Sequence, residues 1–158
     1  MKPKIYIETS IPSFYYENRQ DPAAVARCQW TQQWWDNCRN DYELVSSQAV
    51  LDELNNGNYP KRKKCVTLIL ELPLLPIEPD VTVIVQTYLQ HKVMPNEISG
   101  DALHLALASY HKCDILLTWN CQHLANANKL NHIRRINSLL GLYVPLLTTP
   151  LELLGGQP

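Results

Sequence analysis

Four polar residues stand beside apolar segments, at places where an α/β fold would present a side chain at the end of an element. Glu8 ends a short apolar run near the N-terminus, and Asn120 directly follows a second apolar run. Glu53 and Asp101 lie in segments whose apolar residues have helical spacing. Three carboxylates and one amide oxygen brought together would form an oxygen-only site for a hard divalent cation such as Mg²⁺ or Mn²⁺. These residue types therefore predict metal-assisted phosphodiester chemistry.

The elements that must position these residues alternate along the chain. Short apolar segments bounded by turn residues predict strands at 4–8, 42–46, 74–77, 113–119 and 146–148. Helical patterns lie between them, at 22–39, 50–54, 61–70, 79–92, 100–111 and, as two short helices, around 124 and at 133–140. Strands separated by helices imply βαβ units, so we expect an α/β fold with a mostly parallel sheet covered on both faces.

Capping residues mark several helix starts. Asp21, followed by proline, is typical of an N-cap, and Ser46 or Ser47 is expected to cap the helix that carries Glu53. Residues 94–96 predict a loop, and Ser99 is expected to cap the helix that follows.

Convergence of the four polar residues follows from the fold class. Open parallel sheets bind ligands at the carboxyl ends of their strands, which is where Glu8 and Asn120 are expected. Glu53 lies beside the apolar stripe of its helix, and Asp101 lies in a first helical turn, where the dipole favours a carboxylate. Carboxylates gathered in this way repel one another and tend to hold protons unless a cation neutralises them.

The composition predicts a single soluble domain over residues 1–158. Hydrophobic residues make up 46% and charged residues 18% of the chain, which is ordinary for a globular protein. The formal net charge is -1, so any nucleic-acid contact must come from local basic patches. The sequence has no pattern of a secretory signal or a spanning helix, and we therefore expect a cytoplasmic protein without membrane contact.

The five cysteines predict reduced thiols, because their number is odd and no CxxC spacing occurs. One alternative is a zinc site that joins His111 and Cys113 to Cys121 and His123. The strand expected between the two pairs, at about 3.3 Å per residue, would carry them to opposite ends of the sheet. The spacing therefore disfavours zinc.

Four segments of the chain resemble the acidic motifs of PIN domains. They are Tyr6-Ile7-Glu8-Thr9-Ser10, Ser47 to Leu54 with Glu53, Asp101 to Ala108, and Leu117-Thr118-Trp119-Asn120. The resemblance covers nearly the whole chain. It implies a three-layer α/β/α fold with a five-stranded sheet in the order 3-2-1-4-5, and a ribonuclease that depends on Mg²⁺ or Mn²⁺. It also implies metal-binding, catalytic roles for Glu8, Glu53, Asp101 and Asn120.

Two residues depart from the PIN pattern, which usually has aspartate at both positions. Glu8 is one methylene longer, and Asn120 keeps an oxygen but lacks the negative charge. The departures favour weaker metal binding and leave the occupancy of a second metal open. They also keep an alternative open, a catalytically silent PIN-like module that binds RNA or protein. An aspartyl-phosphate-type site is disfavoured, because its nucleophile would be aspartate.

Several further residues are candidates for contacts with substrate or with the carboxylates. Thr9, Ser10, Thr118 and His123 are expected near the site, where they would hold a water or phosphate unless they only cap the adjacent elements. His104, one turn after Asp101, either donates to that carboxylate or is a satisfied core histidine.

Partners follow partly from the resemblance and partly from the residues. Single-domain bacterial PIN proteins are commonly VapC-like toxins held inactive by an antitoxin, so the resemblance implies an RNA substrate and a cognate antitoxin in a type II pair. The basic run at 61–64 would touch RNA or form a solvated helix start. Trp30, Trp34 and Trp35 cannot all face one side of a helix, which predicts one partly exposed ring and an interface with an antitoxin or with a second copy in a homodimer.

Overall fold

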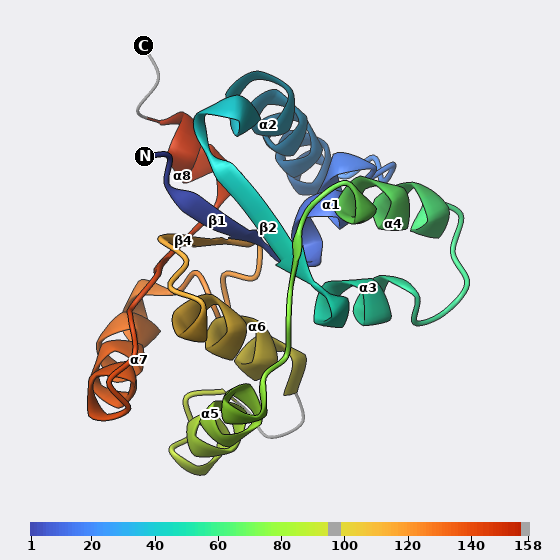
Figure 1. Cartoon of the computed structure of the whole chain (residues 1–158). Helices are drawn as coiled ribbons and strands as arrows, with labels where there is room; N and C mark the ends of the chain where they lie inside the picture. Colours follow the sequence, from blue (N-terminus) through green and yellow to red (C-terminus); the bar gives the residue numbers. More distant parts are fainter. Residues whose placement is uncertain (95–98, 156–158) are drawn as a thin grey trace.

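The computed structural model describes residues 1–94 and 99–155, in which five parallel strands form one sheet in the order β3-β2-β1-β4-β5. The strands are β1 (Lys4–Ile7), β2 (Glu43–Ser47), β3 (Leu74–Leu75), β4 (Ile115–Leu117) and β5 (Leu146–Thr148). Helices flank both faces of this sheet (Figure 1). The predicted three-layer α/β/α class and the strand order are therefore confirmed.

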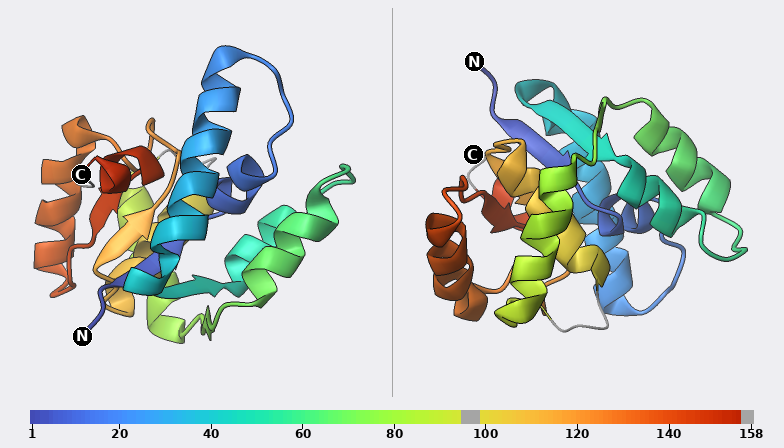
Figure 2. Two further views of the ribbon diagram at one scale, coloured as in Figure 1. Left: turned by 90° about the horizontal axis from the view of Figure 1, so that it is seen from above. Right: turned by 60° about the horizontal axis from the view of Figure 1, so that its bottom comes forward.

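The helices divide between the two faces of the sheet according to their place in the chain. They are α1 (Ser10–Tyr15), α2 (Pro22–Cys38), a 3-10 turn at Arg39–Asp41, α3 (Gln48–Leu54), α4 (Arg62–Leu70), α5 (Pro79–Gln90), α6 (Ser99–Tyr110), α7 (Ala127–Leu139) and α8 (Pro150–Leu154). Helices α1, α2 and α4 lie on one side, and α5, α6 and α7 lie on the other (Figures 1 and 2). Helix α8 packs against α2, and α3 contacts α6.

The central strand β1 forms the middle of the core. Ile5 pairs with Leu44 of β2 on one side and with Ile115 of β4 on the other. Ile5, Tyr6 and Ile7 are fully buried because helices cover both faces of the sheet. Because Tyr6 is fully buried, its hydroxyl must form hydrogen bonds inside the protein.

The helix starts agree with the capping analysis in part. Asp21 caps α2 and accepts a hydrogen bond from the backbone of Ala24 at 3.2 Å. Ser47 is the N-cap residue of α3, but its side chain makes no capping hydrogen bond. Ser99 is the first residue of α6 instead of the residue before it. Of the loop predicted at 94–96, only Met94 lies within the described residues.

Of the two short helices predicted around 124 and at 133–140, the first is wrong and the second is part of the longer helix α7. The segment around Leu124 is a turn, in which the backbone N–H groups of Leu124 and Ala125 donate to the carbonyl of Asn120. Helix α7 begins at Ala127, six residues before the predicted start at 133, because the Asn126 side chain caps it by accepting from Asn128 at 2.9 Å. Asparagine at an N-cap is a strong start signal.

The tryptophans of α2 mostly enter the core. Trp34 and Trp35 are buried, whereas Trp30 is half-buried and stacks on Trp119 with ring centroids 6.1 Å apart. The expected partly exposed ring is therefore Trp30. Within the described residues, no helix is both long enough and apolar enough to span a bilayer.

Candidate functional site

The candidate site lies at the carboxyl edge of the sheet, where β1 and β4 end side by side. The backbone N–H of Glu8 donates to the carbonyl of Leu117 at 3.2 Å, which extends the pairing of the two strands by one residue. Glu8 follows β1, and Thr118 to Asn120 follow β4. The topology therefore brings two of the predicted motifs together directly, although they are more than a hundred residues apart in the sequence.

The Glu8 carboxylate is buried and is held by hydroxyl groups. Its Oε1 atom accepts from Thr118 Oγ1 at 2.6 Å, from the Ser10 backbone at 3.1 Å and from the Ser10 hydroxyl. Because all three hydrogen bonds end on Oε1, they fix the orientation of the side chain and favour its other oxygen as a ligand atom.

Ser10 and Thr118 have further roles in the same network. The Ser10 hydroxyl accepts from the backbone of Trp119 at 2.8 Å, and the Thr118 hydroxyl accepts from the backbone of Asn120 at 2.9 Å. These hydroxyls thus organise the chain after β4 around Glu8. Thr9 lies nearby, with Oγ1 3.5 Å from Nε2 of His104. Substrate contacts by Thr9, Ser10 and Thr118 stay predictions.

Asp101 lies in the first turn of α6 and is buried. Its Oδ2 atom accepts from the Asn120 side-chain amide at 2.9 Å. Burial and the nearby charge of Glu8 raise the pKa of Asp101, although His104, Asn120 and His123 partly oppose this effect. Asp101 and Glu8 therefore repel each other electrostatically, as predicted for a carboxylate cluster.

The side-chain amide of Asn120 directs its NH₂ group, and not its oxygen, at Asp101. The amide oxygen accepts from the backbone N–H groups of Gln122 at 3.2 Å and His123 at 3.0 Å. Turning the amide over would place NH₂ against these two donors, so the hydrogen bonds determine its orientation. The predicted role of this oxygen as a metal ligand stays a prediction, and in this arrangement the oxygen is used to shape the turn.

Glu53 reaches the site from the far side, at the end of α3. Its Oε1 atom contacts Nε2 of His104, and the side chain is 41% exposed. Gly100 makes room for this contact, because a Cβ atom at that position would lie 3.1 Å from Oε1 of Glu53. The exposed carboxylate of Glu53 therefore lies between Gly100 and the buried ring of His104.

His104 is fully buried and was not among the predicted site residues. Its Nδ1 atom lies 2.7 Å from the Tyr6 hydroxyl, which lies 2.7 Å from the Ser47 hydroxyl. Burial lowers the pKa of His104, but the hydrogen bond with Glu53 and the charges of Glu8, Glu53 and Asp101 outweigh it and raise the pKa. Burial also raises the pKa of Tyr6 well above its usual value.

Three of these side chains form a compact donor set. Glu8, Glu53 and His104 each offer a ligand atom, and these atoms lie within 4.8 Å of one another. Two carboxylates and an imidazole fit a divalent transition metal such as Mn²⁺. Asp101 is not part of this compact set, although its charge raises the pKa of His104.

The sequence did not predict the contact between His104 and Glu53. The available signal was its place three residues after Asp101, on the same helix face. The sequence left two roles open, a donor to Asp101 or a satisfied core histidine, whereas the tertiary contact is with Glu53, on another helix. Tyr6 and Ser47, which support the histidine, could not be paired from the sequence because they belong to different strands.

His123 lies near Asp101 but is not part of the compact donor set. Its side chain is half-buried, and its Nδ1 atom is buried without a hydrogen-bond partner among the described residues. A phosphate contact by His123 stays a prediction. Within the described part of the chain, the compact donor set is the one group of three or more metal-ligating side chains, so His111, Cys113, Cys121 and His123 do not gather around a zinc position.

An aromatic and cationic cluster adjoins the carboxylates. The Arg27 guanidinium lies 5.6 Å from the ring centre of Phe14 and 5.5 Å from that of Trp119. Trp30 stacks on the same Trp119, whose backbone donates to Ser10 of the Glu8 network. Trp119 itself is buried, so the half-buried Arg27, Phe14 and Trp30 are the members exposed enough to stack with nucleobases.

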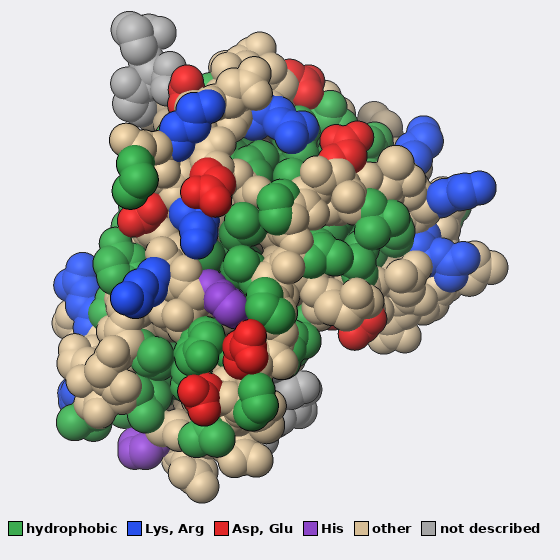
Figure 3. Space-filling model, in the orientation of Figure 1, with side chains coloured by type: hydrophobic (Ala, Val, Ile, Leu, Met, Phe, Trp, Pro, Cys, Tyr) green, Lys and Arg blue, Asp and Glu red, His purple; other side chains and the backbone are tan. Residues whose placement is uncertain are grey.

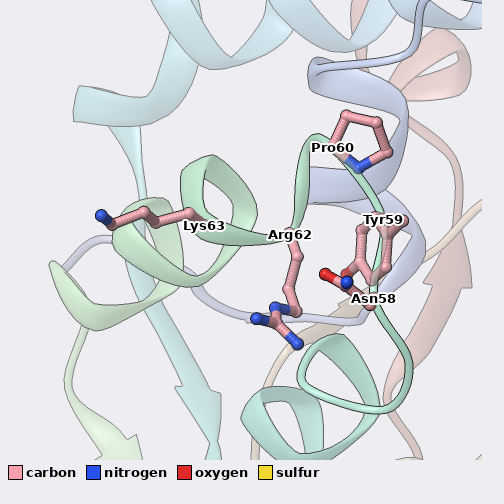
Figure 4. Close-up of a pocket in the computed structure, with 5 residues that line it drawn as sticks. All are labelled: Asn58, Tyr59, Pro60, Arg62 and Lys63. Carbon is pink, nitrogen blue, oxygen red and sulfur yellow. The ribbon is translucent and has the colours of Figure 1, made fainter.

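A separate hollow lies beside the start of α4 and is lined by Asn58, Tyr59, Pro60, Arg62 and Lys63 (Figure 4). Its side chains serve the local loop, since Arg62 donates to the carbonyl of Gly57 at 2.8 Å and Tyr59 donates to that of Leu54 at 2.6 Å. Lysine and arginine side chains project from the surface around α4 (Figure 3). The hollow contains none of the site carboxylates.

Comparison of the chain with models of known protein families finds no match, and comparison with curated proteins finds none either.

Proposed function

We propose that this protein is a metal-dependent endoribonuclease that hydrolyses RNA phosphodiester bonds. The observation that carries the proposal is the gathering of Glu8, Glu53 and Asp101 at the carboxyl edge of a parallel sheet, with Glu8 and Asp101 buried close enough for one to raise the pKa of the other. Such a cluster is most stable with a bound cation. The resemblance to PIN domains supports the same activity.

The chain's own residues have distinct roles in this proposal. Glu8 and Glu53 would hold the cation, Mg²⁺ or Mn²⁺, and Asp101, whose raised pKa suits proton transfer, would orient the attacking water. Asn120 would hold Asp101 in place through the hydrogen bond that its amide NH₂ group donates. When bound, the cation supplies polarisation of a phosphate oxygen and activation of water.

RNA is favoured as the substrate by the cluster of Arg27, Phe14, Trp30 and Trp119. The net charge of -1 gives no general attraction for nucleic acid, so binding must be local. Arg27, Phe14 and Trp30 are half-buried and offer a cation and aromatic faces, and the buried Trp119 that they contact links them to Ser10 of the Glu8 network. A single-stranded substrate could stack its bases there while its backbone reaches the carboxylates.

The proposal extends to the biological setting through the resemblance. We infer that the protein acts in the cytoplasm as the toxin of a type II toxin–antitoxin pair, with a cognate antitoxin and with a second copy in a homodimer. Trp30 would contribute to such contacts, because its ring is half-buried whereas Trp34 and Trp35 are buried in the core.

Asp101→Asn tests the enzymatic proposal. Asparagine keeps the shape and can still accept the hydrogen bond from Asn120, so folding should be retained. Cleavage of single-stranded RNA in Mn²⁺ or Mg²⁺ should fall at least about a hundredfold, as for the loss of one preorganised electrostatic group. The matched control is Asp52→Asn, which removes an exposed carboxylate of α3 that bonds to Gln48.

The control should cleave RNA like the wild type. If the wild type shows no metal-dependent cleavage above the Asp101→Asn background on structured and unstructured RNAs, the nuclease proposal is wrong.

A catalytically silent module that binds RNA or protein is the second candidate. The orientation of Asn120 favours it, because an amine faces Asp101 where the PIN pattern has a fourth carboxylate. RNA binding that is unaffected by metal, together with absent cleavage, would support this candidate.

A further inference from the structure

His104 occupies an unusual position for a histidine in an apolar helix. Its ring is fully buried, yet Nε2 faces the carboxylate of Glu53 at the edge of the site. The same nitrogen lies in one compact donor set with Glu8 and Glu53. A buried ring with one nitrogen at a site of two carboxylates has the geometry of a ligand.

The other side of the ring is anchored as metal-ligating histidines usually are. Nδ1 lies 2.7 Å from the hydroxyl of Tyr6, which lies 2.7 Å from the hydroxyl of Ser47. Without metal, Nε2–H donates to Glu53. When a cation binds, this proton would be released to solvent, Nδ1–H would donate to Tyr6 and Tyr6 to Ser47, and the lone pair of Nε2 would face the cation. A hydrogen bond on the remote nitrogen fixes the tautomer and the ring orientation of a ligand histidine. All three of these side chains are fully buried, so the anchor is rigid.

We propose that Nε2 of His104 is a direct ligand of the divalent cation, together with the carboxylates of Glu8 and Glu53. This inference rests on the metal dependence in the proposed function and changes the expected ligand set from oxygen only to mixed nitrogen and oxygen. It assigns Asn120 to the support of Asp101. Because Mg²⁺ prefers oxygen and water ligands and imidazole suits transition metals, the site should select Mn²⁺ over Mg²⁺.

Mn²⁺ alone is a sufficient probe for this proposal. Pulsed electron paramagnetic resonance of the full chain with one equivalent of Mn²⁺ should detect coupling to a histidine nitrogen. His104→Gln should abolish this coupling while circular dichroism shows a folded protein. Tyr6→Phe keeps the ligand and removes its anchor, so the coupling should persist while Mn²⁺ affinity falls roughly tenfold to a hundredfold. His123→Gln, the nearby control, should keep the coupling.

Calorimetry provides the second measurement. The wild type should bind Mn²⁺ at least about tenfold more tightly than Mg²⁺, and His104→Gln should lose most of this preference, since the preference arises from the nitrogen ligand.

The outcomes separate this inference from the proposed function. Bound Mn²⁺ without nitrogen coupling, or coupling that vanishes in His123→Gln and persists in His104→Gln, would overturn the role of His104 and leave the nuclease proposal intact. Failure of the wild type to bind Mn²⁺ or Mg²⁺ would overturn the metal dependence, and this inference with it.

Discussion

Individual side chains at the site are each held by several partners, and Asn120 is the clearest case. Its oxygen accepts two backbone N–H groups of the following turn, and its amine donates to Asp101. One amide thus joins the loop after β4 to the first turn of α6. This dual use requires an amide, because a carboxylate at this position could not donate to Asp101.

Asn120→Asp is expected to destabilise the metal-free protein. The new carboxylate can still accept from the turn, but it loses the donor to Asp101 and adds like-charge repulsion, at a cost of roughly 1–3 kcal/mol. Mn²⁺ should restore more stability to the variant than to the wild type, because a cation relieves the repulsion. Urea unfolding in a chelator and in Mn²⁺ measures both effects. Equal stability of the two proteins in the chelator would contradict the observed orientation.

Helix α6 shows how one element serves the site at several positions. Asp101 and His104 lie one turn apart on its inward face, and Gly100 leaves space for Glu53 of α3. The carboxylate of Glu53 therefore occupies space that a side chain at position 100 would share.

Gly100→Ala is expected to displace Glu53 and to weaken its contact with His104. Alanine in a helix would by itself stabilise the protein by about 0.5–1 kcal/mol relative to glycine, but here its Cβ would meet Oε1 at 3.1 Å. In a Glu53→Ala background the same substitution should be neutral or stabilising. A double-mutant cycle of unfolding free energies isolates the conflict. Additive effects of the two substitutions would show that no conflict exists.

The segment after α1 and the start of α4 are joined by a partly buried ion pair between Glu17 and Lys61. Glu17 accepts from Arg19 at 3.1 Å, and Lys61 lies 3.4 Å from the same carboxylate. Burial acts to raise the pKa of Glu17, but the hydrogen bonds from Arg19 and the charges of Lys61 and Arg19 lower it to about 2. Part of the basic run thus supports the fold.

Glu17→Gln is expected to destabilise the protein at neutral pH by roughly 1–3 kcal/mol, since the folded state lowers the pKa of this carboxyl. A group whose folded pKa is lowered contributes stability above its unfolded pKa. The difference between wild type and variant should therefore shrink as pH falls from about 4.5 to about 2. Urea midpoints at several pH values give this profile. Glu71→Gln, which breaks a 3.9 Å exposed pair with Arg39, should have little effect. A pH-independent difference at Glu17 would refute the assigned shift.

The sheet as a whole gathers the site from separate parts of the chain. Adjacent parallel strands β1 and β4 place Glu8 and Thr118 side by side, and the contacting helices α3 and α6 bring Glu53 and Asp101 to the same edge. A ligand that binds this assembled edge binds only the folded protein.

Mn²⁺ or Mg²⁺ at millimolar concentration is therefore expected to raise the melting temperature, with the stabilisation growing as RT ln(1 + [L]/Kd). Glu53→Gln should lose most of this response and remain folded without metal. Differential scanning fluorimetry with and without a chelator measures the response. An undiminished rise in the variant would remove Glu53 from the metal site.

The sequence alone determined the fold class and the location of the candidate site. The strand at 146–148 matches β5 at both ends, and Asp21 caps α2 as expected, because apolar patterning and capping are local properties. The positions of Glu8 and Asp101 at element ends followed from the same patterns.

Tertiary structure decided what these residues contact. The amine of Asn120 faces Asp101, and Nε2 of His104 faces Glu53, because the packing of α3, α6 and the loop after β4 sets these directions. No local sequence pattern predicts which atom of an amide or an imidazole will contact a residue from another element. Local sequence fixes where a polar group stands along its element, whereas its partner depends on how distant elements pack.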